Sequence, residues 1–312
     1  MGDSYERKNL VIPDLFAEKV VYFAAPLVRH SHLPFRLLSR SWGCDVACTP
    51  MTIAKNFVCS PGCRDSHYQF LKEDIPCVVQ FAATDASWFA QACEMVAPYC
   101  HGVDINTGCP IKGHVKKGYG CALLKKPQLV CDMVREAKGR CGSLPISVKT
   151  RLLPDLKDSV EMARRIEMIG ASWLSIHGRL QHDRSAVVPV NLEGLKFVKS
   201  AVSIPVVGNG DIFSQADALN MAKVTGVNGV MAARGILENP SLFLGTHHPP
   251  AQCLSDFLYL SMELDLPYKV ARKTMTWQLT GVTDRKEQNR FSELEGMEKM
   301  VEFVEGLCEG MQ

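Results

Sequence analysis

The residues best suited to chemistry recur at regular intervals along this chain. Cys109 is followed, in steps of 40, 28, 32 and 25 residues, by Lys149, His177, Asn209 and Arg234. A thiol can donate a proton, whereas lysine, imidazole, amide and guanidinium groups together suit an electron-rich ligand that carries phosphate. Because one strand with its following helix takes about 30 residues, the spacing predicts a repeating fold that brings these groups to one place.

The cysteine itself lies in the stretch DINTGCPIKGHVKKGYG, from Asp104 to Gly120. Pro110 removes a backbone donor and stiffens the turn that aims the sulfur. A glycine-hinged basic lid is expected directly after this turn, with the charged residues Lys112, His114, Lys116 and Lys117. Such a charge run is either a solvated surface or a surface that neutralises the phosphates of a polyanion beside the cysteine.

Eight short apolar segments alternate with helical patterns and predict the elements that position these residues. Several segments are almost continuously apolar, as in parallel strands buried on both faces, so we expect a closed (β/α)8 barrel. An open doubly wound sheet is the alternative, but no GxGxxG follows the first strand. The predicted strands are Val21–Ala25, Cys44–Thr49, Cys77–Ala83, Gly102–Asn106, Ile146–Arg151, Trp173–Gly178, Ile204–Asp211 and Gly229–Arg234, and the clearest helices are Ala86–Ala97, Pro127–Lys138, Asp158–Ile169, Leu192–Ala201 and Gln215–Val224.

The C-terminal part of the sequence has a different pattern. THHPPA, from Thr246 to Ala251, has the composition of a linker, so the expected domains are a barrel over 1–245 and a small helical domain over 246–312. Helical spacing predicts helices at Cys253–Leu264, Pro267–Leu279 and Phe291–Leu307. The basic residues of this part form either a solvated face or an RNA-binding surface; they are Lys269, Arg272, Lys273, Arg285, Lys286 and Arg290.

Composition bounds the class of protein. The 312 residues are 46% hydrophobic and 22% charged with a net charge of +2, so RNA binding requires local rather than bulk basicity. The longest apolar run, Val20–Val28, is too short for a membrane span, and thirteen irregularly spaced cysteines indicate reduced thiols in an intracellular protein.

Cys44, Cys48, Cys59 and Cys63 could be read as a metal site, but we favour buried thiols and expect no metal, with Cys44 and Cys48 on one strand face.

Polar residues end almost every predicted strand, where a barrel of this kind builds its active site. GNGDI (Gly208–Ile212) and ARG (Ala233–Gly235) follow the last two strands, where barrels often bind phosphate through loop amides and a helix N-terminus. Each motif alone has an ordinary structural reading, as a turn or a surface arginine; together they favour phosphate. The full set of strand ends is Pro26, Gln80, Asn106, Lys149, Arg151, His177, Arg179, Asn209, Asp211 and Arg234.

These motifs, in this order, resemble the tRNA-dihydrouridine synthases. The resemblance is carried by AAP (Ala24–Pro26), VQF (Val79–Phe81), DINTGCP (Asp104–Pro110), GYGCALL (Gly118–Leu124), VKTR (Val148–Arg151), IHGR (Ile176–Arg179), GNGD (Gly208–Asp211) and ARG. It covers residues 1–245 closely, and the tail fits the family's tRNA-recruiting domain more loosely. PCVVQFAA, with RDS (Arg64–Ser66) upstream, is most similar to the fourth eukaryotic subfamily, which acts at positions 20a/20b of the tRNA D-loop.

The resemblance implies an FMN enzyme that reduces uridine in tRNA to 5,6-dihydrouridine with NADPH or NADH. Cys109 would protonate C5 after hydride reaches C6, a role that suits a thiol with an ordinary pKa of about 8.5. Asn106, Lys112, Arg151, Arg179 and Arg184 would contact the RNA. FMN would be held by Pro26, Leu27, Val28, Gln80, Lys149, His177, Asn209, Gly210, Asp211, Ala233 and Arg234. The expected location is the cytoplasm, to which a nuclear pool could be added, and neither a membrane nor an obligate protein partner is expected.

Three positions depart from the family pattern. Leu27 replaces a methionine, Cys121 stands where a small residue is usual and could pair reversibly with Cys109, and Leu180–Pro189 lacks an aromatic residue. Two other functions remain open at this point: an RNA-binding flavin barrel that has lost catalysis, and a reductase of a free pyrimidine. Intact Cys109, Lys149, His177 and Arg234 favour the enzyme, and the basic lid and helical tail favour a large substrate.

Overall fold

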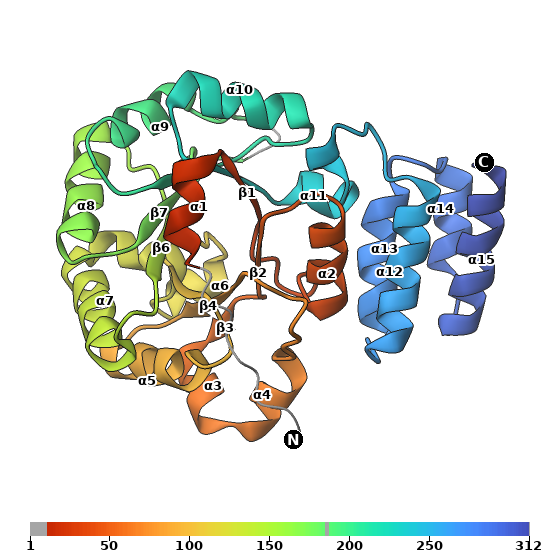
Figure 1. The fold of residues 1–312 in the computed structure, drawn as a ribbon, viewed down its shortest axis with the longest axis horizontal. Coiled ribbons are helices and arrows are strands. Elements are labelled where there is room, and N and C mark those ends of the chain that lie inside the picture. The colour runs from red at the N-terminus through yellow and green to blue at the C-terminus, as the bar shows by residue number, and fades with distance from the viewer. Residues whose placement is uncertain (1–10, 185–186, 312) are drawn as a thin grey trace.

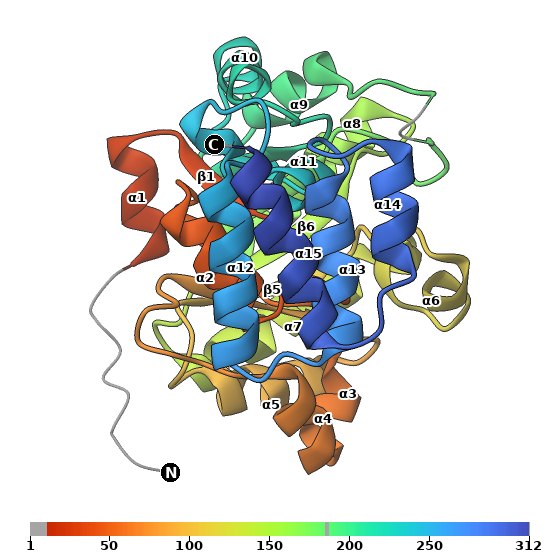
Figure 2. The same ribbon diagram turned by 90° about the vertical axis from the view of Figure 1, so that its right-hand side faces the viewer.

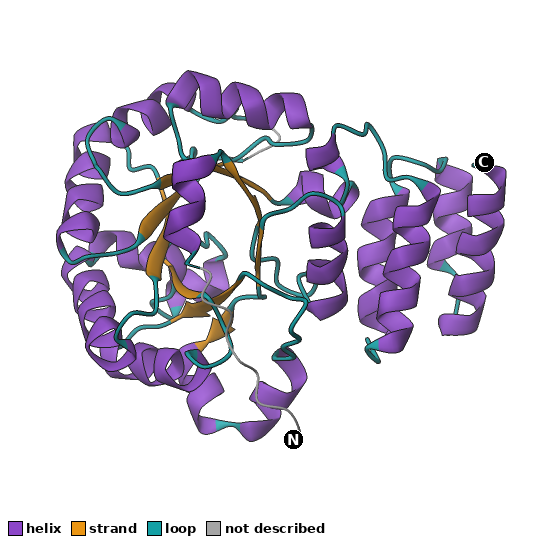
Figure 3. Cartoon of the chain, viewed as in Figure 1, coloured by secondary structure: helices purple, strands orange, loops and turns teal. Residues whose placement is uncertain are grey.

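A closed barrel of parallel strands forms the body of the molecule in the computed structural model, which describes residues 11–184 and 187–311 (Figures 1 and 3). β1 pairs with β2 and β9, and β2 pairs with β4, which closes the ring. The predicted barrel is confirmed. Its strands are β1 (Val21–Ala24), β2 (Val46–Cys48), β4 (Cys77–Ala82), β5 (Gly102–Asn106), β6 (Ile146–Arg151), β7 (Trp173–His177), β8 (Val206–Asn209) and β9 (Gly229–Ala232), and β3 (Thr52–Ile53) extends the sheet beside the end of β4.

Helices surround the ring as crossover connections. Several begin at a side chain that caps the first turn, including Asp85, Asp155, Asn191 and Ser214. The helices of the barrel are α2 (Leu33–Ser41), α3 (Ala54–Cys59), α4 (Pro61–His67), α5 (Ala86–Val96), α6 (Lys112–Lys116), α7 (Pro127–Cys141), α8 (Leu156–Met168), α9 (Leu192–Lys199), α10 (Gln215–Thr225) and α11 (Arg234–Glu238), with the 3-10 turns η1 (Gly120–Lys125) and η2 (Leu242–Leu244).

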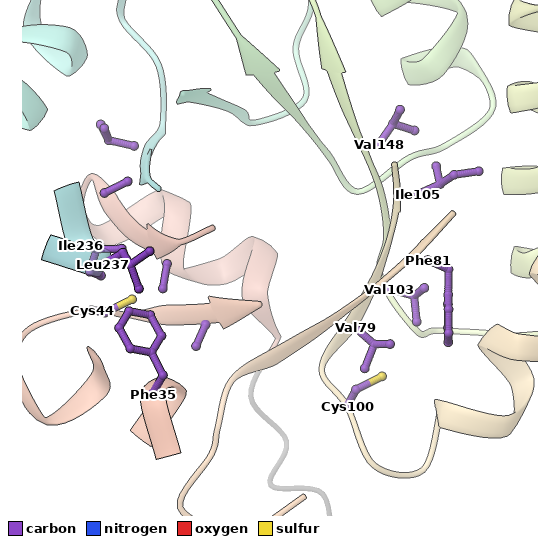
Figure 4. Packing of buried hydrophobic residues seen from close by; sticks show 14 of the residues in the cluster. Phe35, Cys44, Val79, Phe81, Cys100, Val103, Ile105, Val148, Ile236 and Leu237 are labelled. Carbon is purple, nitrogen blue, oxygen red and sulfur yellow. The ribbon is translucent and has the colours of Figure 1, made fainter. Parts of the chain in front are cut away.

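Successive residues of each strand face opposite sides of the barrel wall. Val79, Phe81, Val103, Ile105 and Val148 point outward and are buried against the helices (Figure 4). The alternate residues face the interior. Amide, lysine and imidazole side chains face the interior at the C-terminal ends of the strands, so this end of the barrel is the one suited to a ligand.

An N-terminal helix, α1 (Ile12–Glu18), closes the other end of the barrel. Ile12 and Phe16 are buried in a separate interior cluster with Phe23 and Trp173, and the Phe16 and Phe23 rings stack 6.0 Å apart. α1 and α6 lie at opposite ends of the barrel in Figure 2. This helix was not expected from the sequence.

The C-terminal part is a bundle of helices packed beside α2 and α11 (Figure 1). Its buried residues, among them Phe257 and Met275, continue the apolar layer around the barrel. Trp42 Nε1 donates a 3.1 Å hydrogen bond to Asp256 across this contact. The helices are α12 (Ala251–Glu263), α13 (Tyr268–Leu279), α14 (Arg285–Ser292) and α15 (Met297–Gly310). Across the described part of the chain, no helix is long and apolar enough to cross a membrane.

Two expectations from the sequence are wrong. The single helix predicted over Phe291–Leu307 is split, because the chain leaves the helical path before Gly296, whose φ is +94°. Cys44 and Cys48 do not share a strand face: β2 starts only at Val46, Cys44 packs in the outer apolar layer, and Cys48 faces the barrel interior. Within the described residues, no cluster of histidine, cysteine and acidic side chains could hold a metal ion.

Candidate active site

The strand register brings the polar residues at the C-terminal ends of the strands to one level. Asn106 is paired with Lys149 between β5 and β6, and His177 is paired with Asn209 between β7 and β8. Gln80 is paired with Asp104 between β4 and β5, one layer of inward-facing residues further from the mouth. The mouth of the barrel is therefore lined by amide, amine and imidazole groups above an apolar floor.

A continuous chain of hydrogen bonds supports the cysteine from below. Asp104 accepts hydrogen bonds from Ser147 Oγ at 2.6 Å and from Gln80 Nε2 at 2.7 Å. Gln80 Oε1 accepts from Asn106 Nδ2 at 2.9 Å, and Asn106 Oδ1 accepts from the amide of Cys109 at 2.9 Å. The position of the thiol is thus tied to a buried carboxylate inside the barrel.

Burial shifts the pKa of both charged groups in this layer. Desolvation raises the pKa of Asp104 to about 6, although hydrogen bonds from Ser147 and Gln80 and the charge of Lys149 oppose the rise. Desolvation lowers the pKa of Lys149 to about 8, against the attraction of Asp104. Lys149 Nζ donates a 3.0 Å hydrogen bond to Asn209 Oδ1. Near neutral pH both groups are mostly charged, and Lys149 remains a donor at the mouth.

His177 is held as a neutral imidazole. Burial lowers its pKa from 6.5 to about 2, and the positive charges of Lys149, Arg151, Arg179 and Arg234 act in the same direction. Its Nδ1 atom is buried and makes no hydrogen bond to any described residue. A buried ring nitrogen without a partner is costly. A bound ligand with a hydrogen-bonding ring would satisfy it, so this part of the mouth fits such a cofactor.

The loops after β8 and β9 form a small cavity of about 40 Å³. Gly210 and Asp211 have positive φ angles of +128° and +51°, which turn the chain sharply at its edge. α11 begins against this turn: a Cβ added at Gly235 would lie 2.0 Å from the carbonyl oxygen of Ile212. Backbone amides and the exposed guanidinium of Arg234 can both reach an anion here.

Two of the arginines predicted to contact substrate are bound by the protein itself. Arg179 is 2% exposed, forms an ion pair with Asp211 and donates to the carbonyl of Val188. Arg151 donates to the carbonyl oxygens of Gly108 at 2.7 Å and Leu180 at 3.1 Å. They brace the loops of the mouth.

The other predicted substrate residues lie in different settings. Arg184 is exposed in the loop after β7, and Lys112 is exposed at the start of α6. Asn106 is 8% exposed and belongs to the hydrogen-bond chain below the cysteine.

The end of β1 contributes one rim of the mouth. Pro26 and Leu27 are half-buried, and Val28 is 46% exposed. The amide of Leu27 donates a 3.0 Å hydrogen bond to Ser31 Oγ, which holds this turn in place. The adjacent part of the rim, after the paired strand β9, is formed by Ala233 before α11.

The expected lid forms a short helix followed by a tight turn. Cys109 is half-buried, and its carbonyl oxygen accepts a 3.0 Å hydrogen bond from the amide of Cys121. Gly120, with φ +57°, brings the two segments so close that a Cβ there would lie 2.5 Å from the Cys109 oxygen. Both thiols are free, and burial raises the pKa of Cys121 to about 11.

A wider groove adjoins the mouth on the side of the helical bundle. It lies between the loops after β1 and β2 and the connection from α12 to α13. Charges of both signs line it, from Arg29, Asp65, Asp265 and Lys273.

Sequence reasoning assigned no role to Asp104 or Ser147. Asp104 belongs to the quoted cysteine motif, and its period-two relation to Asn106 already places both on the inner face of one strand. Ser147 has the same relation to Lys149 on the next strand. The alternation of inward-facing and outward-facing residues along these strands was the signal that could have identified Asp104 and Ser147.

Comparison with known proteins agrees with this geometry. A family model described as dihydrouridine synthase (Dus) matches residues 23–308. The chain is 38% identical over 301 residues to the Homo sapiens protein tRNA-dihydrouridine(20a/20b) synthase [NAD(P)+]-like, covering 96% of this chain and 94% of that protein. It is 39% identical over 257 residues to the tRNA-dihydrouridine(20a/20b) synthase of Saccharomyces cerevisiae, covering 81% of this chain and 70% of that protein.

Comparison with a solved structure shows a similarity of fold alone. Histamine dehydrogenase from Rhizobium sp. 4-9 matches with a TM-score of 0.54 at 14% identity, over 80% of this chain and 51% of that one. Fold and mouth thus define a parallel-barrel enzyme with a ligand site at the C-terminal ends of its strands. The chain belongs to the dihydrouridine synthase family. It is therefore an oxidoreductase of the tRNA-dihydrouridine synthase type.

Proposed function

We propose that this enzyme reduces uridine to 5,6-dihydrouridine at positions 20a and 20b of the tRNA D-loop, with FMN as cofactor and NADPH as electron donor. The names of the human and yeast relatives support the positions and the nicotinamide donor. The structural observation that carries the proposal is the placement of the Cys109 thiol at the rim of a mouth that contains His177 with an unsatisfied ring nitrogen.

The residues of the mouth divide naturally between the two ends of FMN. Gln80, Lys149, His177 and Asn209 would hold the ring system, and Pro26, Leu27 and Val28 would form its outer rim. Gly210, Asp211, Ala233 and Arg234 would hold the phosphate, in the cavity between the last two strands. FMN bound there would supply the hydride.

The protein's own part in the reaction is proton transfer and orientation. When C6 of uracil has received hydride, negative charge develops at C5, and the Cys109 thiol donates its proton there, leaving a thiolate. Asn106 orients both the base and the cysteine turn. Arg151 and Arg179 fix the surrounding loops.

RNA contacts would come from the exposed basic residues around the mouth. Lys112 and Arg184 lie on the loops after β5 and β7, and Lys273 lines the groove beside the helical bundle. We propose that residues 246–312 form the domain that recruits tRNA, and that the groove receives the segment around the target uridine. A target base must leave its stack to reach the mouth. We propose the cytoplasm as the place of action.

An anaerobic absorption experiment tests this function. The purified protein, supplied with FMN, should show a flavin spectrum that NADPH bleaches and that tRNA lacking dihydrouridine restores. The Cys109→Ala variant should bleach equally but recover at least a hundredfold more slowly. Absence of flavin binding would refute the mechanism, and bleaching without recovery on any tRNA would point to a small-molecule acceptor. Mapping dihydrouridine in the product tRNA then tests positions 20a and 20b.

A further inference from the structure

A histidine outside the predicted site lies beside the proposed acid. The Nδ1 atom of His114 is 3.8 Å from the Sγ atom of Cys109, within hydrogen-bonding range for sulfur. His114 lies on α6, five residues after the cysteine in sequence. The sequence identified His114 only as one of the basic residues of the expected lid.

The main chain fixes both partners of this contact. The amide of Cys109 donates to Asn106, and its carbonyl accepts from Cys121, so the thiol cannot move far from the turn. The amide of His114 donates a 2.9 Å hydrogen bond to the carbonyl oxygen of Ile111. The carbonyl oxygen of His114 accepts a 3.0 Å hydrogen bond from the amide of Tyr119. The contact is therefore a property of the fold.

The imidazole connects the sulfur with solvent. His114 is half-exposed, whereas Cys121, on the other side of the cysteine turn, is 1% exposed. The charged groups that face the pair are Lys149 and Arg151 from β6 and the exposed Lys112 and Lys116 from α6 itself. None of the described acidic side chains forms a hydrogen bond or ion pair with either partner.

We propose that His114 is the residue that returns a proton to Cys109 after each turnover. This inference rests on the proposed function, in which Cys109 loses its proton to C5 of uracil. RNA that covers the mouth keeps bulk water from the thiolate, so the proton must arrive through a side chain that reaches both sulfur and solvent. The imidazolium form of His114 gives the proton on Nδ1 to Sγ, and the ring then takes a proton from solvent.

Thiol alkylation tests the pair without any turnover. Iodoacetamide labelling of Cys109 is followed by peptide mass spectrometry from pH 5 to 9. The dependence of the labelling rate on pH should differ between the wild type and His114→Gln, because the imidazole contacts the sulfur. Cys59, which is exposed, serves as the reference thiol in the same sample, and His247→Gln changes an exposed histidine elsewhere.

Turnover separates proton return from proton donation. With enzyme reduced beforehand, the first turnover of His114→Gln should match the wild type within about twofold, because the thiol starts protonated. Steady-state turnover should fall roughly 10- to 100-fold. Added imidazole should restore much of the steady-state rate of His114→Ala, which also shows that the variant is folded.

The outcomes are distinct. Wild-type alkylation and wild-type turnover in His114→Gln would overturn the inference, and so would altered alkylation with unchanged turnover, because the ring would then only tune the thiol. A slowed first turnover would also overturn it. Full activity of Cys109→Ala would instead remove the proposed function of the cysteine, and the alkylation experiment would still report on the contact itself.

Discussion

The side-chain amide of Gln80 donates a 2.7 Å hydrogen bond to the carboxylate of Asp104 inside the barrel, where neither residue is more than 4% exposed. Because an ionised carboxylate only accepts hydrogen bonds, this contact fixes which way the amide points. Gln80 Oε1 must then face Asn106, and Asn106 Oδ1 must face the amide of Cys109. One negative charge thus sets the orientation of the polar groups up to the thiol.

Asp104→Asn should change how stability depends on pH. Since burial raises the pKa of Asp104 from 3.8 to about 6, the folded protein between these pH values keeps a proton that the unfolded chain has released. The free energy of unfolding of the wild type should therefore fall by at most about 3 kcal/mol as pH rises from 4 to 6, because the proton on Asp104 is lost. The variant has no such proton and should not show this fall. Urea denaturation of both proteins without cofactor at pH 4.5, 5.5 and 7 measures the difference. A difference that does not change with pH would contradict this account.

His177→Gln should make the protein less sensitive to acid. The pKa of His177 is lowered to about 2, so below pH 6.5 the unfolded chain binds a proton that the folded protein excludes. Wild-type stability should fall by up to about 2 kcal/mol between pH 7 and 5 through this residue alone. The variant should lose that part of the dependence, while His182→Gln, which changes an exposed histidine, should keep it. The same urea titration checks both variants.

Breaking the Arg179–Asp211 ion pair should be costly. Asp211→Asn leaves a guanidinium that is 2% exposed without its charge partner, and we expect a loss of about 3 kcal/mol. Arg179→Met combined with Asp211→Asn should cost less than the two single changes together. The Arg135–Asp132 pair, with side chains 62% and 43% exposed, is the control, and its removal should cost less than about 1 kcal/mol. Additive effects at Arg179 and Asp211 would show that the pair is not coupled.

Gly235→Ala should disturb the proposed phosphate cavity. The new Cβ would lie 2.0 Å from the carbonyl oxygen of Ile212, which must move and open the contact between α11 and the turn after β8. We expect FMN affinity to fall at least tenfold in a fluorescence titration. Gly306→Ala is the matched control, since its Cβ meets nothing within 4 Å in α15, and it should raise stability by up to about 1 kcal/mol. Unchanged FMN affinity in Gly235→Ala would place the phosphate elsewhere.

Replacing Lys112, Lys116 and Lys117 by glutamine should weaken tRNA binding and its salt dependence. All three are exposed beside the mouth. If each neutralises a phosphate, the slope of log affinity against log salt should become shallower by about 2. The same three charges removed at Lys157, Lys196 and Lys223, exposed on α8, α9 and α10, should leave the slope almost unchanged. Equal slopes for both triple variants would show that the lysines of α6 do not bind RNA.

Most of the barrel could be predicted because each of its strands carries its own apolar signal. α1 could not, since its seven residues bury only Ile12 and Phe16, and only the finished barrel provides the surface that covers them. The break before Gly296 was missed for a related reason: helical spacing of apolar residues continues through it, and only the backbone conformation of the glycine shows the turn.

The candidate site, too, could be predicted only in part from the sequence. Strand ends located Lys149, His177 and Asn209 at one level, because parallel strands share their direction. Contacts between residues far apart in sequence could not be predicted: Arg179 meets Asp211 across 32 residues. An arginine directed at RNA and one that braces a loop have the same local sequence, and only their partner distinguishes them.

Closure of the barrel by α1 has a consequence for the order of events. Among the described residues, Ile12 and Phe16 of α1 fill one end of the barrel, so we expect reactants to enter and leave by the opposite end. In the proposed reaction, the nicotinamide and the uracil both reach the site through this entrance. The oxidised donor must therefore dissociate before the tRNA binds. Reciprocal plots of rate against NADPH at several fixed tRNA concentrations are then parallel lines.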